Sequence, residues 1–319
     1  MAKKTAKKSN DVSDIRVLVA WKPHQGKNSD NAAVLDYASW LARTSPIQIR
    51  MVTTFVRPWP STSIAKLGGK YQKWHAKETE GCVAAARKAL SSSGIPEEYW
   101  DDTVALFLDG PSESALLAKA AKDFGADLIL MNSDDVTVKG RFLAGSTMES
   151  LLHSTPTLIG LMPSSTKLSK RGITRLTYGF IDGEQDSAAL RDTAMRAAEW
   201  DLPLRIVAFA PDILDDSVLL DPLTVQTEIS VQWREHLFAL LDRAKDEVAS
   251  EFPNLTIETE IGSGGNWAGA IDAVKWKKGD LLTLSSAPMN PLERVFVGSA
   301  TSHILQYAPV PALIRPVAR

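Results

Sequence analysis

The feature that most constrains this sequence is an internal repeat. Residues 103–163 align without a gap with residues 256–316. The matching positions shape turns and helix ends: Asp127-Leu128 falls on Asp280-Leu281, Gly145-Ser146 on Gly298-Ser299, and Pro156 on Pro309. Chance similarity would not select such residues so consistently, so one unit of roughly 150 residues is built twice.

Both copies alternate short apolar runs with amphipathic stretches. The first copy predicts strands at 15–21, 47–55, 103–108, 128–133 and 157–162, with helices at 31–43, 76–90, 112–124 and 146–153. The second predicts strands at 175–181, 204–209, 256–261, 281–284 and 312–317, with helices at 187–200, 225–250, 267–275 and 299–306. Strands separated by helices pair in parallel through right-handed crossovers. We therefore expect two Rossmann-like, doubly wound α/β domains in tandem, each with a five-stranded parallel sheet and related by a pseudo-two-fold axis.

The same order sets the expected domain boundaries. Residues 1–13 form a basic tail that we expect to be disordered, and residues 14–163 form the first domain. Residues 164–172 are short, polar and poor in helix formers, which is typical of a linker. The second domain then covers residues 173–319.

Composition excludes several classes of function. The chain has 36 basic and 38 acidic residues, so its formal net charge of −2 gives no electrostatic case for nucleic-acid binding. The single cysteine, Cys82, excludes an internal disulfide and lies in an apolar run typical of a buried core. The start of the chain lacks the apolar core of a signal peptide, and no stretch is apolar enough to span a membrane. We expect a soluble, cytoplasmic protein.

Sheets of this kind bind ligands outside the carboxyl ends of their strands, next to strands one and four. The Gly-Ser pair of each copy follows strand four. Glycine permits close backbone approach, and serine caps a helix whose free N–H groups can bind an anion. A plain helix start would need the same two residues, but their recurrence favours a ligand site that includes Gly145, Ser146, Gly298 and Ser299.

These stretches resemble the universal stress protein family. In the first copy the resemblance is carried by Ala126-Asp127-Leu128-Ile129, Gly145-Ser146-Thr147 and Pro156, and in the second by their repeats. The segment Gly179-Phe180-Ile181-Asp182-Gly183 also resembles the family's first strand, which ends in Asp-Gly. The resemblance covers nearly the whole chain and implies a tandem, UspA-like stress-response protein with adenine nucleotide α-hydrolase-like domains.

Nucleotide-binding members of that family share a loop of the form Gly-x-x-Gly-x9-Gly-(Ser/Thr). Its first two glycine positions hold Asn132 and Asp135 in the first copy, and Ser285 and Pro288 in the second. Without these glycines the backbone loses its close approach to phosphates, Asp135 adds a negative charge and Pro288 removes a donor. Both loops are therefore degenerate.

The family's first-strand aspartate, which contacts the nucleotide, matches Asp182 in the second copy, whereas the first copy has Trp21-Lys22-Pro23 there. The resemblance thus implies that ATP or AMP binding is weak and favours the second copy, through Asp182, Gly298 and Ser299 with Ser285. Gly262 lies in a glycine-rich run after strand three, and in the family the loop at this place borders the nucleotide. The same run equally fits a chain turning into a helix.

No catalytic or metal constellation stands out. The five histidines lack metal-binding spacing, and Asp101-Asp102 is typical of solvated loop charges. Trp21, Trp59 and Trp74 fit core packing, with an apolar crevice lining as the alternative. We expect a non-catalytic binding or regulatory module. The alternatives are a scaffold or signalling protein that has lost nucleotide binding and, more distantly, a nucleotide hydrolase-like enzyme.

The last strand of each copy would leave an open sheet edge. Family members pair through this strand, so the resemblance implies that segments 157–162 and 312–317 pair antiparallel within the chain. The expected partners are an adenine nucleotide and a second copy of the chain in a homodimer, with no membrane and no nucleic acid.

Overall fold

The computed structural model describes residues 14–23, 31–57, 66–132, 146–163, 166–180, 184–211, 225–286 and 300–316. Its first half contains β1 (Ile15–Ala20), α1 (Asn31–Ala42), β2 (Ile47–Val56), α3 (Gly69–Ser92), the 3-10 helix η1 (Glu97–Tyr99), β3 (Trp100–Gly110), α4 (Glu113–Phe124), β4 (Leu128–Asn132), α5 (Ser146–Ser154) and β5 (Leu158–Met162). Its second half contains β6 (Arg175–Phe180), α6 (Glu184–Glu199), β7 (Leu204–Pro211), α7 (Val225–Glu251), β8 (Ile257–Gly264), α8 (Trp267–Asp272), β9 (Asp280–Ser285), α9 (Ala300–Tyr307) and β10 (Ala312–Arg315). The predicted basic tail lies outside the described residues.

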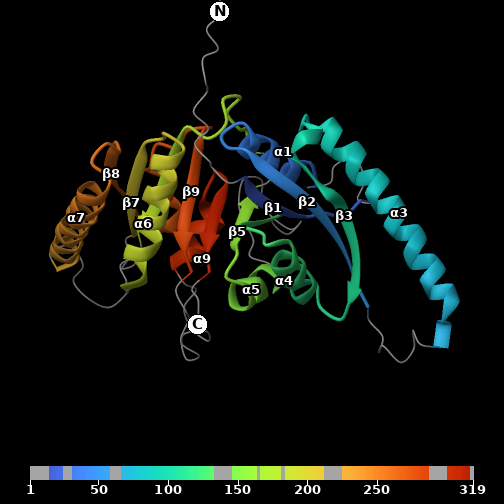
Figure 1. The fold of residues 1–319 in the computed structure, drawn as a ribbon. Helices are drawn as coiled ribbons and strands as arrows, with labels where there is room; N and C mark the ends of the chain where they lie inside the picture. The colour runs from blue at the N-terminus through green and yellow to red at the C-terminus, as the bar shows by residue number, and fades with distance from the viewer. Residues whose placement is uncertain are drawn as a thin grey trace, which may run out of the picture.

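The strands form one sheet of ten, in the order β3-β2-β1-β4-β5-β10-β9-β6-β7-β8 (Figure 1). Read outward from the middle, each half has the same order of strands five, four, one, two and three. All neighbours within a half pair in parallel. The expected α/β fold with two Rossmann-like units in tandem is confirmed.

The halves meet at the middle of the sheet, where β5 pairs antiparallel with β10. Leu313 lies opposite Gly160, and Ile314 lies opposite Ile159. A Cβ at Gly160 would stand 2.4 Å from the side chain of Leu130 in β4, so the glycine leaves room for that leucine. Both of these strand edges are therefore used within the chain.

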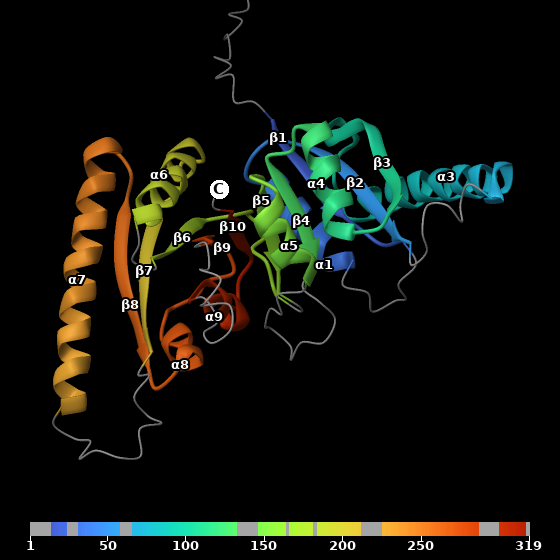
Figure 2. The ribbon, with the colours of Figure 1, turned by 90° about the horizontal axis from the view of Figure 1, so that it is seen from below.

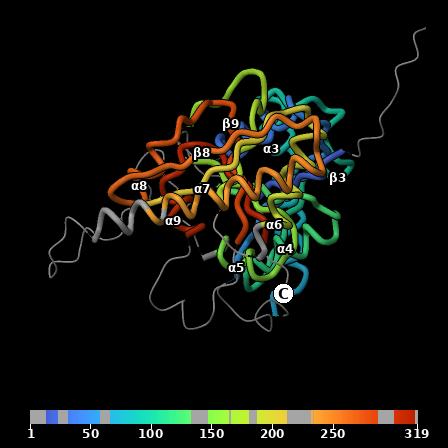
Figure 3. The backbone as a smooth tube through the Cα atoms, turned by 90° about the vertical axis from the view of Figure 1, so that its left-hand side faces the viewer, coloured from blue at the N-terminus to red at the C-terminus, as the bar shows by residue number. Residues whose placement is uncertain are grey.

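Helices cover both faces of the sheet, and the buried side chains form one apolar core on each face. One core packs α1, α3, α6 and α7 against the sheet, and the other packs α4, α5, α8 and α9. In β1 the alternation is direct, since Val17 and Val19 belong to the first core and Leu18 to the second. Figure 2 shows α3 and α7 at opposite ends of the molecule, and Figure 3 views it from the α7 end.

Most predicted elements are present, with shifted ends. The clearest difference is β3, which begins at Trp100 rather than at 103 because Asp101 is buried and its charge is paired. Arg50 in β2 donates to Asp101 Oδ2 from Nε at 2.9 Å and from Nη2 at 2.6 Å. The prediction that Asp101 is a solvated loop charge is therefore wrong.

The segment between the halves makes hydrogen bonds to both of them. The backbone N–H of Ile173 donates to Thr44 Oγ1 at 2.8 Å, and the N–H of Ser169 donates to the Lys278 carbonyl at 2.9 Å. The predicted boundaries at 163 and 173 stay predictions. None of the described helices combines the length and the apolar character needed to cross a bilayer.

Candidate functional site

The carboxylate of Glu113 lies near the carboxyl ends of the first-half strands, the side on which sheets of this kind form their ligand crevice. Its Oε1 accepts a hydrogen bond from Thr54 Oγ1 at 2.9 Å, and its Oε2 accepts one from Thr147 Oγ1 at 3.1 Å. Lys22 Nζ lies 3.6 Å from Oε1. The carboxylate thus joins the end of β2 and the segment after β1 to the first turn of α5, where the helix dipole favours negative charge.

Local sequence explains why Glu113 lies there. Ser112 has an extended backbone and caps α4, because its side chain accepts from the Ala115 N–H at 3.4 Å. Glu113 is then the first helical residue, a position that favours an acidic side chain. Gly125 ends the same helix with φ 64°, a left-handed conformation that suits glycine. The Ser-Glu pair after strand three is a helix-start signal, and the sequence alone does not show that Glu113 lies near the carboxyl ends of the strands.

Of the first-half loop residues, the structure describes Asn132 and Ser146. Asn132 ends β4, and its Oδ1 is buried without a hydrogen-bond partner among the described residues. Ser146 is the first residue of α5. Gly145 and Asp135 lie outside the described residues, so their contribution to a site stays a prediction.

The tryptophans give little support to an apolar crevice lining. Trp21 is buried in the core, and its carbonyl accepts from Thr53 Oγ1 at 2.9 Å. Trp74 extends from α3 and packs edge-on against Phe55 of β2, with ring centroids 5.2 Å apart. Trp59 lies outside the described residues. For Trp21 and Trp74, core packing is the role that the contacts support.

The second-half crevice is described only in part. Ser285 ends β9, its side chain is buried, and its carbonyl accepts from Thr301 Oγ1 at 2.8 Å. The structure therefore ties the end of β9 to the first turn of α9. Asp182, Gly298 and Ser299 lie outside the described residues, and their convergence with Ser285 stays a prediction.

Gly262 has a packing reason for being glycine. It lies in β8, and a Cβ there would stand 2.2 Å from the Ala270 carbonyl oxygen and 2.7 Å from Val274 Cγ2. Asn266 caps α8 by accepting from the Gly269 N–H at 2.9 Å. The close approach of α8 accounts for the glycine without a ligand, so a nucleotide contact at Gly262 stays a prediction.

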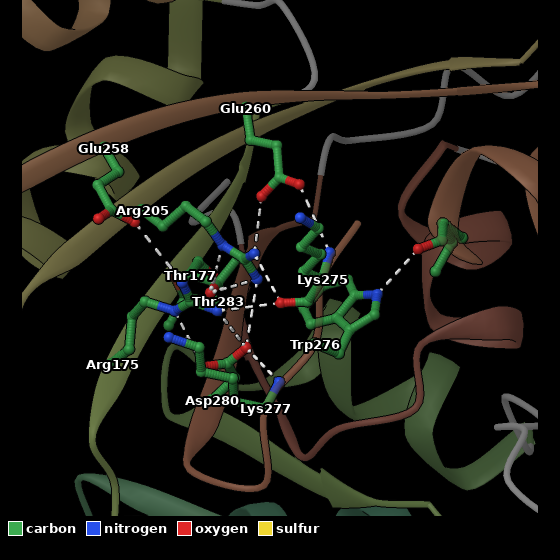
Figure 4. Close-up of polar contacts among 11 residues, drawn as sticks. Arg175, Thr177, Arg205, Glu258, Glu260, Lys275, Trp276, Lys277, Asp280 and Thr283 are labelled. Carbon is green, nitrogen blue, oxygen red and sulfur yellow. Dashed lines mark hydrogen bonds and ion pairs between the residues drawn. The ribbon is translucent and has the colours of Figure 1, made fainter. Parts of the chain in front are cut away.

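The recurrent Asp-Leu pattern lies at the amino end of strand four in each half, opposite the carboxyl end that borders the crevice of that half. Asp280 begins β9 and is fully buried within a cluster of charged side chains (Figure 4). Arg175 donates to Asp280 Oδ1 from Nε at 2.9 Å and to Oδ2 from Nη2 at 2.7 Å. Arg205 Nη2 adds a hydrogen bond to Oδ2 at 3.3 Å, and Arg205 Nη1 lies 2.8 Å from Glu260 Oε2.

This cluster holds two arginines side by side in a poorly hydrated place. Burial first, and then the neighbouring charge of Arg175, lowers the pKa of Arg205. The guanidinium of Arg205 also lies 5.1 Å from the ring centroid of Trp276. Asp280 neutralises part of this charge, which makes its role structural.

The corresponding aspartate of the first half, Asp127, has fewer charged partners. Asp127 Oδ2 accepts a hydrogen bond from the backbone N–H of Arg16 at 2.9 Å. The guanidinium groups of Arg16 and Arg50 lie over the Phe124 ring, at 4.7 Å and 4.2 Å from its centroid. The Asp-Leu repeat therefore marks the start of strand four in both halves and contributes no crevice residue. Over the parts of the chain that the structure describes, no three His, Cys, Asp or Glu side chains are grouped to hold a metal ion.

Comparison with known proteins agrees with this architecture. Residues 175–316 match the model of the universal stress protein family. The chain is 26% identical over 289 residues to Universal stress protein Rv2319c of Mycobacterium tuberculosis, which covers 89% of this chain and 95% of that protein. Universal stress protein Mb2346c of Mycobacterium bovis matches to the same extent.

Solved structures share the fold at low sequence identity. A universal stress protein from Archaeoglobus fulgidus superposes with a TM-score of 0.57 at 14% identity, over 94% of this chain and 97% of that one. A putative universal stress protein from Pseudomonas aeruginosa gives a TM-score of 0.50 at 14% identity, over 95% of this chain and 93% of that one. The chain is therefore similar to universal stress proteins over nearly its whole length, and its second half matches the model of that family.

Proposed function

We propose that this chain is a non-catalytic binding or regulatory module of the stress response that has lost nucleotide binding in its first half. The observation that carries the proposal is the Glu113 carboxylate, held between Thr54 and Thr147 at the first turn of α5. That is where an anionic group of a ligand would use the helix N-terminus. The protein supplies its own anion there.

The energetic consequence can be estimated from Coulomb's law. Two unit negative charges about 4 Å apart repel by about 1 kcal/mol in water and about 4 kcal/mol at the effective dielectric of a protein surface. A phosphate entering the crevice would also have to displace the two threonine hydroxyls from Glu113. Lys22 offsets only part of this repulsion, because its side chain is about half exposed.

The second half lacks this carboxylate. Ser112 caps α4 as Asn266 caps α8, so the residue that corresponds to Glu113 is the uncharged Trp267, the first residue of α8. We propose that any adenine nucleotide, ATP or AMP, is held weakly by the second half, through Asp182, Ser285, Gly298 and Ser299. The degenerate glycine positions keep that affinity low.

A thermal-shift series with ATP, ADP and AMP tests this assignment. A ligand at about 100 times its dissociation constant should stabilise the protein by about 2.7 kcal/mol. We expect the shift to disappear in Asp182→Ala and to persist in Glu113→Gln, which keeps the shape of the side chain. A shift that survives Asp182→Ala would contradict the assignment, and no shift with any nucleotide would favour a scaffold that binds none.

We also propose that the β5–β10 pairing holds the halves together in solution. Because both strand edges are used within the chain, a homodimer would have to form through another surface. The outer strands β3 and β8 are the remaining edges of the sheet. Sedimentation equilibrium would measure whether such a dimer forms.

A further inference from the structure

A cavity of about 350 Å³ lies between the halves, over the seam of β5 and β10. Its walls include Asp127 and Leu158 from the first half, and Arg196, Leu284 and Leu313 from the second. The volume falls within the range of small-molecule sites. The first half contributes residues at the amino ends of its strands, so this cavity is separate from the first-half crevice.

Arg196 is the least satisfied charge in this cavity. It extends from α6, and its guanidinium carbon lies over the Trp200 ring, 5.5 Å from the ring centroid. No hydrogen bond or ion pair joins Arg196 to any carboxylate of the described residues. Burial lowers the pKa of Arg196, while Glu199, Asp127 and Tyr37 act in the opposite direction. A largely buried guanidinium without a paired carboxylate is costly to keep in a fold.

Asp127 faces the same cavity from the other half. Its Oδ2 accepts from the Arg16 N–H at 2.9 Å, and no described residue donates to Oδ1. Asp127 is close enough to Arg196 to stabilise its charged form, yet no ion pair closes the gap between them. The other two charges of the wall, Asp192 and Arg315, pair with each other and are already neutralised.

Next to the two unpaired charges the wall has both apolar side chains and the hydroxyl-bearing Thr157, Thr193 and Thr283. Leu158 and Leu313 line the cavity and also a narrow extension of about 10 Å³ that Asp127 and Arg196 share. That extension has room for about one water molecule. Tyr37 of α1 closes it, and the Tyr37 hydroxyl donates to the Ala312 carbonyl at 3.3 Å. A guest must therefore occupy the main cavity.

We propose that this seam cavity binds a small zwitterion of the α-amino acid class, with its carboxylate on Arg196, its ammonium group on Asp127 and an apolar side chain toward the leucines. A simple anion would satisfy Arg196 but would face the Asp127 carboxylate. A simple cation would meet the opposite conflict. A zwitterion satisfies both charges, and because they come from different halves, binding would link the halves across the seam.

The test is calorimetric titration of the full-length protein with the standard L-amino acids. For the tightest binder, the corresponding decarboxylated amine and deaminated acid serve as ligand controls; for L-leucine these are 3-methylbutylamine and 4-methylpentanoate. We expect at least one amino acid to bind, and both controls to bind about tenfold or more weakly, since each loses one charge-assisted contact. No binding by any amino acid, or equal binding of the deaminated acid, would overturn the proposal.

Variants test which residues carry the binding. Arg196→Met and Asp127→Asn should each lower affinity about tenfold or more. Arg191→Met is the matched control, because Arg191 lies on the same helix but pairs with Glu251 on the surface, and it should bind like the unmodified protein. Binding that survives Arg196→Met would refute the site.

A structural role for Arg196 predicts a different result. If Arg196 served only stability, Arg196→Met would lower the unfolding temperature of the ligand-free protein. Because no carboxylate is left unpaired by its removal, we expect the unfolding temperature to stay the same or to rise. Asp127→Asn supplies the same binding readout from the other half, so the test does not depend on one variant folding.

Discussion

The buried carboxylate of Asp280 offers the sharpest test of the packing described here. Asp280→Asn keeps the size of the side chain and removes its charge. The two oxygens of Asp280 accept hydrogen bonds from Arg175, from Arg205 and from the Lys277 N–H, the last at 2.9 Å. The amide of asparagine would direct its NH2 group toward a guanidinium or toward the backbone donor, so at least one buried donor would lose its acceptor.

The expected loss of stability depends on the partners that Arg175 and Arg205 keep in Asp280→Asn. Arg205 keeps Glu260 at 2.8 Å, whereas Arg175 keeps the Lys275 carbonyl at 3.2 Å and the exposed carboxylate of Glu258 at 3.6 Å. Breaking a buried ion pair from one side costs about 3–5 kcal/mol. Since Arg205 stays partly compensated, we expect about 3 kcal/mol, near the lower end of that range.

The assay is equilibrium unfolding in urea, with the repeat supplying its own control. Asp127→Asn changes the corresponding residue of the first half, where the carboxylate accepts from the Arg16 backbone N–H in an exposed setting. Asparagine keeps an oxygen that can accept this N–H, so the loss of the negative charge should cost about 1 kcal/mol or less. An Asp280→Asn cost below about 1 kcal/mol, or no larger than that of Asp127→Asn, would show that the two arginines do not depend on the Asp280 charge.

Three further predictions concern separate parts of the molecule. Gly262→Ala should lower the free energy of unfolding in urea by about 1–3 kcal/mol, because its Cβ would stand 2.2 Å from the Ala270 carbonyl oxygen. Gly265→Ala is the control and should be nearly neutral, because a Cβ there has open space. Equal effects of the two substitutions would contradict the packing role of Gly262. The Cys82 thiol is buried, and burial raises its pKa, so at neutral pH it should react with a thiol reagent only slowly until the protein is unfolded; rapid labelling of the native protein would contradict this. Hydrogen exchange should protect backbone amides in both Leu158–Met162 and Ala312–Arg315, and fast exchange in both strands would exclude the seam.

Sequence reasoning predicted the order of strands and helices well, because the repeat and the period of the apolar residues carry that information. It failed where a charge was paired through the fold. Asp101 looked like a loop residue because its partner, Arg50, is distant in the chain and becomes a neighbour only when β2 and β3 pair. The start of α3 at Gly69 also lies before the alanine-rich stretch that predicted a helix from 76.

The candidate site was less accessible to sequence reasoning. The degenerate glycine positions can be read from the sequence. The contact of Glu113 with Thr54 and Thr147 cannot, since the three residues lie on three separate elements that meet only in the fold. The role of Gly262 likewise depends on the approach of α8. The sequence showed that the Asp-Leu pattern recurs, but only the fold showed that it lies at the amino end of strand four in each half.

If the unit is built twice and Glu113 closes the first crevice to nucleotide, as we propose, one chain can bind one nucleotide at most. Equilibrium dialysis of the full-length protein against saturating labelled ATP, and separately AMP, measures this directly as nucleotide bound per chain. We expect binding to saturate at no more than one equivalent per chain and to disappear in Asp182→Ala. Saturation at two equivalents per chain would contradict the account.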